Sequence, residues 1–463
     1  MTAAGTLAAI DHFHDLLRRE HGATSHEQLT RAIREGGMIF LGRPKCEVLR
    51  PLFIDGETYG EVQRAATLVA RGLTAISRRL AADPVLRRAL GLTPEEEALI
   101  QMDPAEPTEM VGRLDGFLAA DGEIRFVEYN PMPAGIVSGD ELREAYAGMP
   151  IMEAFHRRYA TRAASTRGLV CDALLRTHHR QGGSGRPNLA VLSQRVGGEA
   201  PSGASLLQFD ELTKLMGIVA AGGFELRIVD PERLRFESGH LFADDFRVDV
   251  ALVADWPLLA RNLDPGAPFY RAVHGRAAWV LNSAATSILR GSKSVFSLLS
   301  DPAHWHGLDA QVAAALARHV PWTRRVQQGN TTYQDRTIDL VPFLAAHRDR
   351  FVLKPADEYG ASGVVLGWQG DDAAWAAALD RALARPYVVQ ERVAIDSQLF
   401  PAMIEGELQV HRRHFTLDPF VWNDTEVHGA HVRLSRSEIL NLSAGEGSIT
   451  PMMILDGEAG GHG

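Results

Sequence analysis

The sequence FVLKPADEYGASGVVLG at residues 351–367 predicts two buried strands joined by a loop of small residues. The first strand ends on Lys354, and a lysine at the end of a buried strand can reach into a cleft as a point charge for phosphate. The loop contains Glu358, Gly360 and Ala361. Its backbone N–H groups could lie over a polyphosphate while Glu358 meets the accompanying metal. An ordinary hairpin with a glycine-rich turn explains this segment equally well.

Two further strands are predicted upstream, where GRLDGFL and EIRFVEYN flank the turn AADG. Side chains two residues apart in a strand face the same way, so Glu128 and Asn130 present oxygen donors side by side. Mg²⁺ prefers oxygen ligands and usually shares them with phosphate and water. The pair therefore predicts a magnesium site, although a strand end followed by a polar turn would carry the same residues.

Two segments on either side of residues 351–367 add candidates for nucleotide binding. Lys293 stands at the start of the predicted helix KSVFSLLSD, from which it could point at a phosphate. An exposed lysine beside a helix start is the alternative. In YVVQERV, residues 387–393, an apolar strand turns polar, and its backbone could read the edge of an adenine base. A plain core strand explains that pattern as well.

The whole sequence predicts an α/β (α+β) protein of two to four domains. Residues 1–105 carry apolar residues at helical spacing, and residues 106–185 hold the strand with the metal-ligand pair. A β-α-β pattern over residues 186–277 follows a glycine-rich linker and predicts an inserted parallel lobe. Residues 278–463 contain the nucleotide segments and, at 441–451, the glycine-rich stretch NLSAGEGSITP.

Composition restricts the classes of partner. The chain has 463 residues and a formal net charge of -10, so it lacks the excess of Lys and Arg that nucleic-acid contacts need. No apolar run approaches the ~20 residues of a membrane span, and the N-terminus has no signal-peptide pattern. Two cysteines in so long a chain indicate free thiols in a reducing compartment. We therefore expect a cytoplasmic protein that binds neither nucleic acid nor membranes.

Together these segments resemble the ATP-grasp superfamily, in particular the circularly permuted branch with eukaryotic-type glutathione synthetase, glutathionylspermidine synthetase and uncharacterised bacterial proteins. The resemblance covers about residues 110–463, and the metal-ligand strand precedes the nucleotide lysines, which is the permuted order. By this resemblance the metal ligands are Glu128, Asn130 and Glu358, and the residues around the nucleotide are Lys293, Lys354, Gly360, Ala361, Gln390, Glu391 and Val393.

The resemblance also implies two basic catalytic residues. They are Arg113, in an Arg-x-Asp motif before the metal pair, and Arg433, in HVRLSR, and both would face the substrate or phosphate. Residues 441–451 would form a closing lid. The chain departs from the family pattern at Gly360-Ala361-Ser362-Gly363, where a double glycine is displaced or replaced, which narrows the backbone options of the loop. The second basic position of the family falls on Ser435 or Arg436.

The function implied by the resemblance is ATP-dependent ligation of a carboxylate to an amine, with ATP and two Mg²⁺ and an acyl-phosphate intermediate. Phosphoryl transfer needs mostly positioning and charge stabilisation, which this set of residues would supply. A small-molecule kinase on the same scaffold would use the same metal and lysine set, and a degenerate loop would suit a non-catalytic nucleotide-binding protein. A homodimer is compatible with the family.

Overall fold

The computed structural model describes residues 3–40, 42–103, 109–119, 121–131, 133–193, 204–254, 256, 264–356, 362–440 and 447–458. Three predicted site residues, Glu358, Gly360 and Ala361, and the first part of the predicted lid, 441–446, lie outside these ranges. Helices and several separate sheets make up the molecule, so the α/β (α+β) class is confirmed. Among the helices of the described ranges, none combines the length and apolarity of a membrane-spanning segment.

A four-stranded antiparallel sheet of order β23-β22-β4-β5 forms the centre of the molecule. Its strands are β4 (Val111–Leu118), β5 (Ile124–Pro131), β22 (Asp418–Trp422) and β23 (Glu426–His431). The predicted hairpin is confirmed, because β4 pairs with β5 and places Asp115 opposite Glu128. The strands β22 and β23 come from near the C-terminal end, so residues far apart in the sequence share one sheet.

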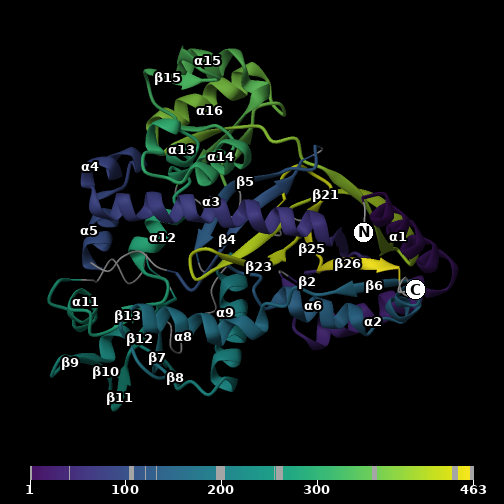
Figure 1. Ribbon diagram of the computed structural model, residues 1–463, viewed down its shortest axis with the longest axis horizontal. Helices are drawn as coiled ribbons and strands as arrows, with labels where there is room; N and C mark the ends of the chain where they lie inside the picture. Colours follow the sequence, from purple (N-terminus) through teal and green to yellow (C-terminus); the bar gives the residue numbers. More distant parts are fainter. Residues whose placement is uncertain are drawn as a thin grey trace.

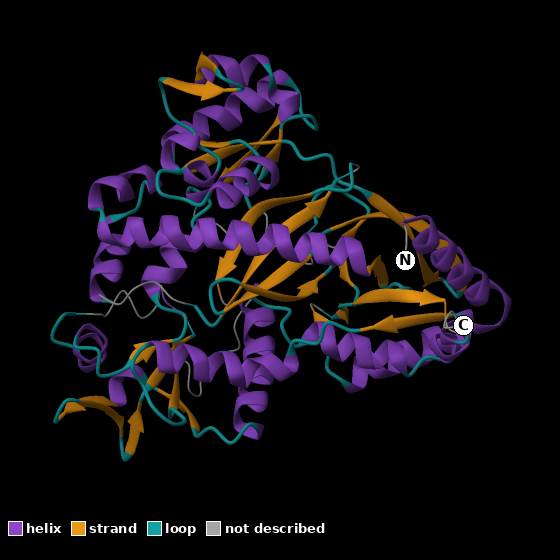
Figure 2. Ribbon diagram, in the orientation of Figure 1, coloured by secondary structure: helices purple, strands orange, loops and turns teal. Residues whose placement is uncertain are grey.

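The long helix α3 (Gly56–Ala82) crosses the centre of the molecule and packs against β22 and β23 (Figures 1 and 2). Its start is fixed by Asp55, whose side chain accepts a hydrogen bond from the Thr58 N–H at 2.9 Å, as a helix N-cap residue does. Apolar residues recur every three or four positions along its buried face, including Val62, Ala66, Val69, Leu73, Ile76 and Leu80.

A second sheet, of order β14-β19-β17-β18, lies in the part of the molecule drawn at the top of Figure 1. It contains β14 (Thr323–Arg325), β17 (Phe351–Pro355), β18 (Val365–Leu366) and β19 (Tyr387–Glu391), with helices α15 (Leu340–Ala346) and α16 (Asp372–Ala384) nearby. The two strands predicted within residues 351–367 do pair, with Leu353 opposite Val365. Lys354 is next to last in β17.

A parallel sheet of order β13-β12-β7-β8 confirms the predicted parallel arrangement. Its strands are β7 (Leu189–Leu192), β8 (Leu226–Val229), β12 (Val250–Val253) and β13 (Trp279–Val280). Helices α8 (Val170–Arg180), α9 (Ala204–Ala221) and α11 (Pro268–His274) lie around it, and β9 (Leu234–Glu237), β10 (His240–Ala243) and β11 (Phe246–Val248) form a small antiparallel sheet. The division of the chain into domains stays a prediction.

Two strands occur where the sequence predicts only helix: β3 (Leu52–Asp55) and β6 (Tyr159–Arg162). Both pair with β26 (Met452–Glu458), from the other end of the chain. All four residues of β3 are buried. Such a short segment has no periodicity of its own, and its conformation comes from a partner about 400 residues away.

The second half of the predicted lid is part of the fixed fold. Strand β25 (Ser448–Ile449) joins a sheet of order β20-β21-β24-β25, with β20 (Ser397–Ile404), β21 (Glu407–Phe415) and β24 (Arg433–Ser435). The Ile449 N–H donates to the Lys45 carbonyl at 2.8 Å, and the Leu52 N–H donates to the Pro451 carbonyl at 2.9 Å. Residues 447–451 are thus hydrogen-bonded along their length to residues 45–52, and a role of residues 441–451 as a closing lid stays a prediction.

The remaining elements complete the described fold. They are α1 (Ala3–Leu16), α2 (Gly22–Glu35), β1 (Ile39–Phe40), β2 (Arg43–Pro44), α4 (Pro84–Arg87), α5 (Pro94–Met102), α6 (Ser138–Ala147), α7 (Pro150–His156), α12 (Ala284–Gly291), α13 (Val295–Leu299), α14 (Ala310–His319), β15 (Asn330–Tyr333) and β16 (Arg336–Asp339).

Gly112 in β4 makes room for the ring of Tyr129 in β5. A Cβ atom at position 112 would overlap the Tyr129 hydroxyl group. Since Tyr129 is buried, we expect Gly112→Ala to lower the free energy of unfolding by about 1–3 kcal/mol, the usual cost of an overpacked core. Chemical denaturation measures this change. Gly139→Ala is the matched control, because no atom lies within 4 Å of a Cβ there. Equal unfolding midpoints for the two variants would contradict the prediction.

Candidate functional site

Two arginines and two aspartates form a buried ionic network over the central sheet. Asp115 of β4 accepts two hydrogen bonds from Arg113, from Nε at 2.6 Å and from Nη2 at 3.1 Å. It also accepts one from Nη2 of Arg433 at 2.6 Å. The Nε of Arg433 donates to Asp418 at 3.0 Å. The structure thus brings together the two predicted catalytic arginines, with two carboxylates that hold them in place.

The charges of this network explain its pKa shifts. Burial alone would raise the pKa of Asp115, but the guanidinium groups of Arg113 and Arg433 hold it well below its usual value. Burial opposes the charge of Arg433, yet Asp115 and Asp418 raise its pKa. Burial raises the pKa of Asp418 to about 6, against the pull of Arg433 and with help from the negative charge of Asp115. The ionic network therefore holds Arg433 as a cation beside β5, which carries the predicted metal-ligand pair.

The two arginines differ in the donors that they have left. Arg113 donates from Nε and Nη2 to Asp115 and from Nη1 to the Ala134 carbonyl, at 2.7 Å. Arg433 uses Nε and Nη2 on the two aspartates, and its Nη1 has no hydrogen-bond partner among the residues that the structure describes. About 20% of the Arg433 side chain is exposed, against 10% of the Arg113 side chain. Arg433 is therefore the better placed of the two to meet an anion.

The predicted metal-ligand pair lies beside this network. Glu128 is opposite Asp115 in the β4–β5 ladder, and Asn130 is opposite Arg113. The two side chains face the same way, as predicted, since Asn130 Nδ2 lies 3.5 Å from Glu128 Oε1. Tyr129 between them is buried on the other face. Within the described ranges, no group of three or more His, Cys, Asp or Glu side chains could hold a metal ion.

Both predicted phosphate lysines reach the same place. Lys293 lies in the turn between α12 and α13, and its Nζ is 3.8 Å from Glu128 Oε2. Its backbone N–H donates to the Ala356 carbonyl at 3.3 Å, directly after the strand that carries Lys354. Burial, together with the positive charge of Lys293, lowers the pKa of Lys354 to about 8, although Glu128 acts in the opposite direction. The mutual influence of these charges indicates one shared electrostatic site.

Gln390 links the two sheets of the site. Its Oε1 accepts a hydrogen bond from Lys354 Nζ at 2.7 Å. Its Nε2 donates to the Val127 carbonyl of β5 at 3.3 Å and to Thr323 Oγ1 at 3.0 Å. The side chain is buried, so it fixes Lys354 against β5. The sequence predicted Gln390 as a nucleotide contact, and this bridging position was not foreseen.

Glu438 accepts hydrogen bonds from the segment after β19 and from Trp368. Glu391 accepts a hydrogen bond from Tyr333 Oη at 2.6 Å, and the half-buried Val393 follows the strand. Arg392 donates to Glu438 Oε1 at 3.1 Å, and Trp368 Nε1 donates to Glu438 Oε2 at 2.5 Å. These hydrogen bonds to Glu438 connect the second sheet to the segment that follows β24.

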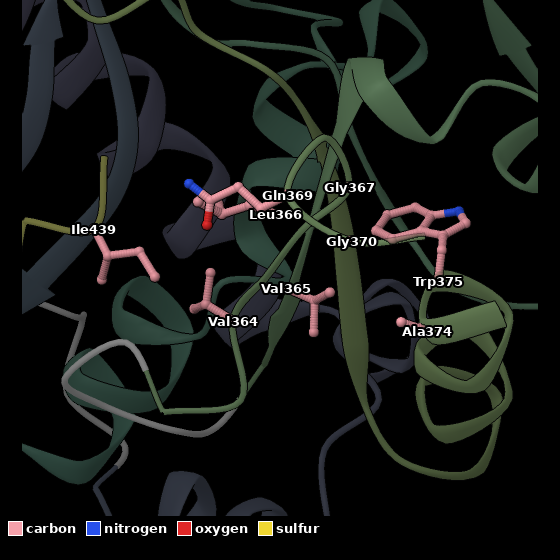
Figure 3. A pocket seen from close by; sticks show the side chains of 9 residues that line it. All are labelled: Val364, Val365, Leu366, Gly367, Gln369, Gly370, Ala374, Trp375 and Ile439. Atoms are coloured by element: carbon pink, nitrogen blue, oxygen red, sulfur yellow. The ribbon is translucent and has the colours of Figure 1, made fainter. Parts of the chain in front are cut away.

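A cavity of about 230 Å³ lies beside the hydrogen bonds of Glu438. Figure 3 shows Ile439 on the opposite side of it from Trp375, with β18 between them. Its lining is mostly apolar and consists of Val364, Val365, Leu366, Gly367, Gln369, Gly370, Ala374, Trp375 and Ile439.

The solved structure of a glutathione synthetase-like effector from Globodera pallida, in its apo form, is similar to 92% of this chain and 96% of that chain, with a TM-score of 0.58. The two proteins share a fold. Sequence identity is only 14%, so the likeness concerns the fold alone. No protein-family model matches this sequence, and neither does any curated protein.

Two polar residues of the site were missed in the sequence. Asp418 begins the apolar strand DPFVW, and a carboxylate entering a buried strand is the signal that could have marked it. His431 lies opposite Asp418 in the β22–β23 ladder. Burial and the charges of Arg113 and Arg433 lower its pKa well below 6.5. Its ring packs against Gly135, where a Cβ atom would lie 2.5 Å from Nδ1. His431 is therefore a neutral group at the edge of a cationic site.

Proposed function

We propose that this chain is an ATP- and Mg²⁺-dependent ligase of the ATP-grasp type, which joins a small-molecule carboxylate to an amine through an acyl phosphate. The observation that carries the proposal is the arrangement of two lysines and an arginine around Glu128, which lies 3.8 Å from Lys293 and whose charge acts to raise the pKa of Lys354 and of Arg433. Lys293 comes from a helix–helix turn, Lys354 from the second sheet and Arg433 from β24. Their order along the chain, with Glu128 before the lysines, is that of the circularly permuted branch.

The donor set fits a metal–nucleotide complex better than a bare metal ion. Glu128 and Asn130 supply two hard oxygen donors, and by family resemblance Glu358 would add a third. The two ammonium groups next to these oxygen donors would repel an isolated cation. Phosphate that arrives with its Mg²⁺ would bind better, because its negative charge pairs with the ammonium groups. Bound ATP would supply the phosphoryl group, and Mg²⁺ would offset its negative charge.

The chain's own residues would bind and orient the reactants. Lys293 and Lys354 would place positive charge against the phosphates, and Gln390 would hold Lys354 in that position. Arg433 would bind the carboxylate of the acid through its remaining donors, while Asp115 and Asp418 orient its guanidinium group. A positioned arginine of this kind favours a carboxylate substrate over the alcohol that a small-molecule kinase would take. We further propose a cytoplasmic protein, compatible with a homodimer, that binds neither nucleic acid nor membranes.

Calorimetry with ATP and Mg²⁺ tests the proposal directly. Wild-type protein should bind ATP in a Mg²⁺-dependent way, and Glu128→Gln should weaken binding at least about tenfold, since a charged ligand to the metal is lost. Glu153→Gln is the matched control, because the Glu153 side chain is 81% exposed and pairs with Arg157 on the surface. Binding would justify a screen of acid–amine pairs for ADP release. No binding by the wild type would overturn the ligase proposal.

A further inference from the structure

A second buried ionic cluster lies on the opposite face of the metal-ligand strand. Arg290, at the end of α12, donates from Nη1 to Asp424 Oδ1 at 2.7 Å and lies 3.7 Å from Glu109 Oε2. Tyr129 Oη donates to the same oxygen of Glu109 at 2.7 Å. Arg180, the last residue of α8, donates to Asp424 Oδ2 at 2.7 Å. Two cations therefore face two carboxylates, and a phenol completes the cluster.

Four members of this cluster are shielded from water, while the side chain of Arg180 is 38% exposed. The exposed fraction is 1% for Arg290, 1% for Glu109, 3% for Tyr129 and 4% for Asp424. Removing one member would leave a buried charge or acceptor without its partner.

The turn that carries Asp424 has a left-handed backbone at two residues. Asn423 and Asp424 have φ of 46° and 76°, in the left-handed region that side chains other than Asn, Asp and Gly rarely adopt. Both residues are held by their side chains. Asn423 donates to the Ala173 carbonyl at 3.0 Å, and Asp424 accepts the Glu109 N–H at 2.9 Å. Left-handed Asn and Asp residues are typical of the tight turns of β-hairpins, and this turn joins β22 to β23.

Each end of the cluster is joined to a residue of the proposed site. Tyr129 lies between Glu128 and Asn130 in β5, so its anchor fixes the strand position of both oxygen donors. Arg290 is three residues before Lys293 and fixes the end of helix α12. The helix end touches the same strand, because a Cβ atom at Gly291 would lie 3.1 Å from the Pro131 ring. The cluster therefore spans from the strand of Glu128 to the turn of Lys293.

We propose that Tyr129, Glu109, Asp424 and Arg290 are positioning residues that set the distance between Glu128 and Lys293 and thereby the affinity for Mg²⁺–ATP. This positioning role rests on the proposed function and adds to it the residues that place Glu128 and Lys293. None of the four side chains needs to touch the nucleotide. Their effect passes through the backbone of β5 and α12, as supporting residues do in other metal and nucleotide sites.

The test is a double-mutant cycle read by calorimetry with Mg²⁺ and ATP. Tyr129→Phe removes one hydroxyl group and should weaken Mg²⁺–ATP binding about five- to tenfold, the size of one lost hydrogen bond. In a Glu128→Gln background the same change should cost less than about twofold, because the ligand that it positions is already lost. A purely structural role for Tyr129 would lower thermal stability and leave the dissociation constant of folded protein unchanged.

Two further variants guard the interpretation. Asp424→Asn keeps an acceptor and the left-handed backbone but removes the charge, so it should also weaken Mg²⁺–ATP binding. It replaces Tyr129→Phe as the test if that variant does not fold. Glu97→Gln breaks the Arg87–Glu97 ion pair, 3.0 Å apart and involving a buried arginine, and should leave binding unchanged. Wild-type affinity in folded Tyr129→Phe and Asp424→Asn would overturn the positioning role alone. Absence of binding by the wild type would overturn the proposed function and, with it, this role.

Discussion

Arg433→Ala is expected to lower the free energy of unfolding by about 3–5 kcal/mol, because it leaves two buried carboxylates without their shared cation. Asp115 would keep Arg113, but Asp418 would keep only the Thr416 hydroxyl, at 2.7 Å, and the Gly116 N–H, at 3.0 Å. ADP formation with an acid–amine pair should fall about 100- to 1000-fold, as when a donor to a developing anion is lost. Chemical denaturation and an ADP-release assay measure the two effects.

Arg433→Lys separates the two effects of this change. The lysine keeps a cation near Asp115 and Asp418, so much of the stability should return. The planar guanidinium group, with its free Nη1, does not return, and activity should stay low. Arg64→Ala, at a side chain that is 70% exposed and 3.9 Å from Glu61, should behave as wild type in both assays. A wild-type unfolding midpoint for Arg433→Ala would contradict the ionic network as the source of stability.

Lys354→Met is expected to weaken ATP binding about 10- to 100-fold, the range of a charge-assisted contact. It should also remove a pH dependence. The pKa of Lys354 in the free protein is about 8, and bound phosphate favours the charged form and raises it. The affinity of the wild type for ATP should therefore be highest below pH 8 and fall as the pH rises above that value. Calorimetry from pH 7 to about 9.5 should show this fall in the wild type and not in Lys354→Met.

The Lys354 contribution to the free energy of unfolding should change with pH in the direction opposite to the affinity for ATP. The pKa of Lys354 in the folded protein, about 8, lies below the ordinary lysine value of 10.5. Between these values the unfolded chain binds more protons, so the Lys354 contribution to folding stability becomes more favourable as the pH rises. Lys354→Met should lack that gain. Lys214→Met, which breaks the 2.7 Å pair with Glu141, is the control lysine. A pH dependence of ATP binding that persists in Lys354→Met would assign it to another group.

Local patterns predicted the parts of the site that depend on local geometry. The alternation around the AADG turn indicated the β4–β5 hairpin and the shared face of Glu128 and Asn130. Lys293 and Lys354 were found because each stands at the end or start of a strongly apolar element. These features need only the two-residue period of a strand or the start of a helix.

Pairings between distant segments could not be predicted in the same way. Strands β3 and β6 exist because β26 lies between them, and neither has a pattern that excludes a helix. The roles of Asp418 and Gln390 depend on which strand lies beside which, and that register is decided by tertiary packing. The anchoring of 447–451 on residues 45–52 has the same origin.

The last strand of the described chain has a consequence for how the protein is made. Strand β26 closes a sheet begun by residues 52–55, and Asp418 and Arg433 join Asp115 only from the C-terminal part of the chain. During synthesis on the ribosome, the N-terminal helices therefore emerge long before their partner strand. The nascent chain exposes the apolar strand β3 until then, so we expect dependence on chaperones during translation and assembly of the ionic network only after residues 418–433 have left the exit tunnel.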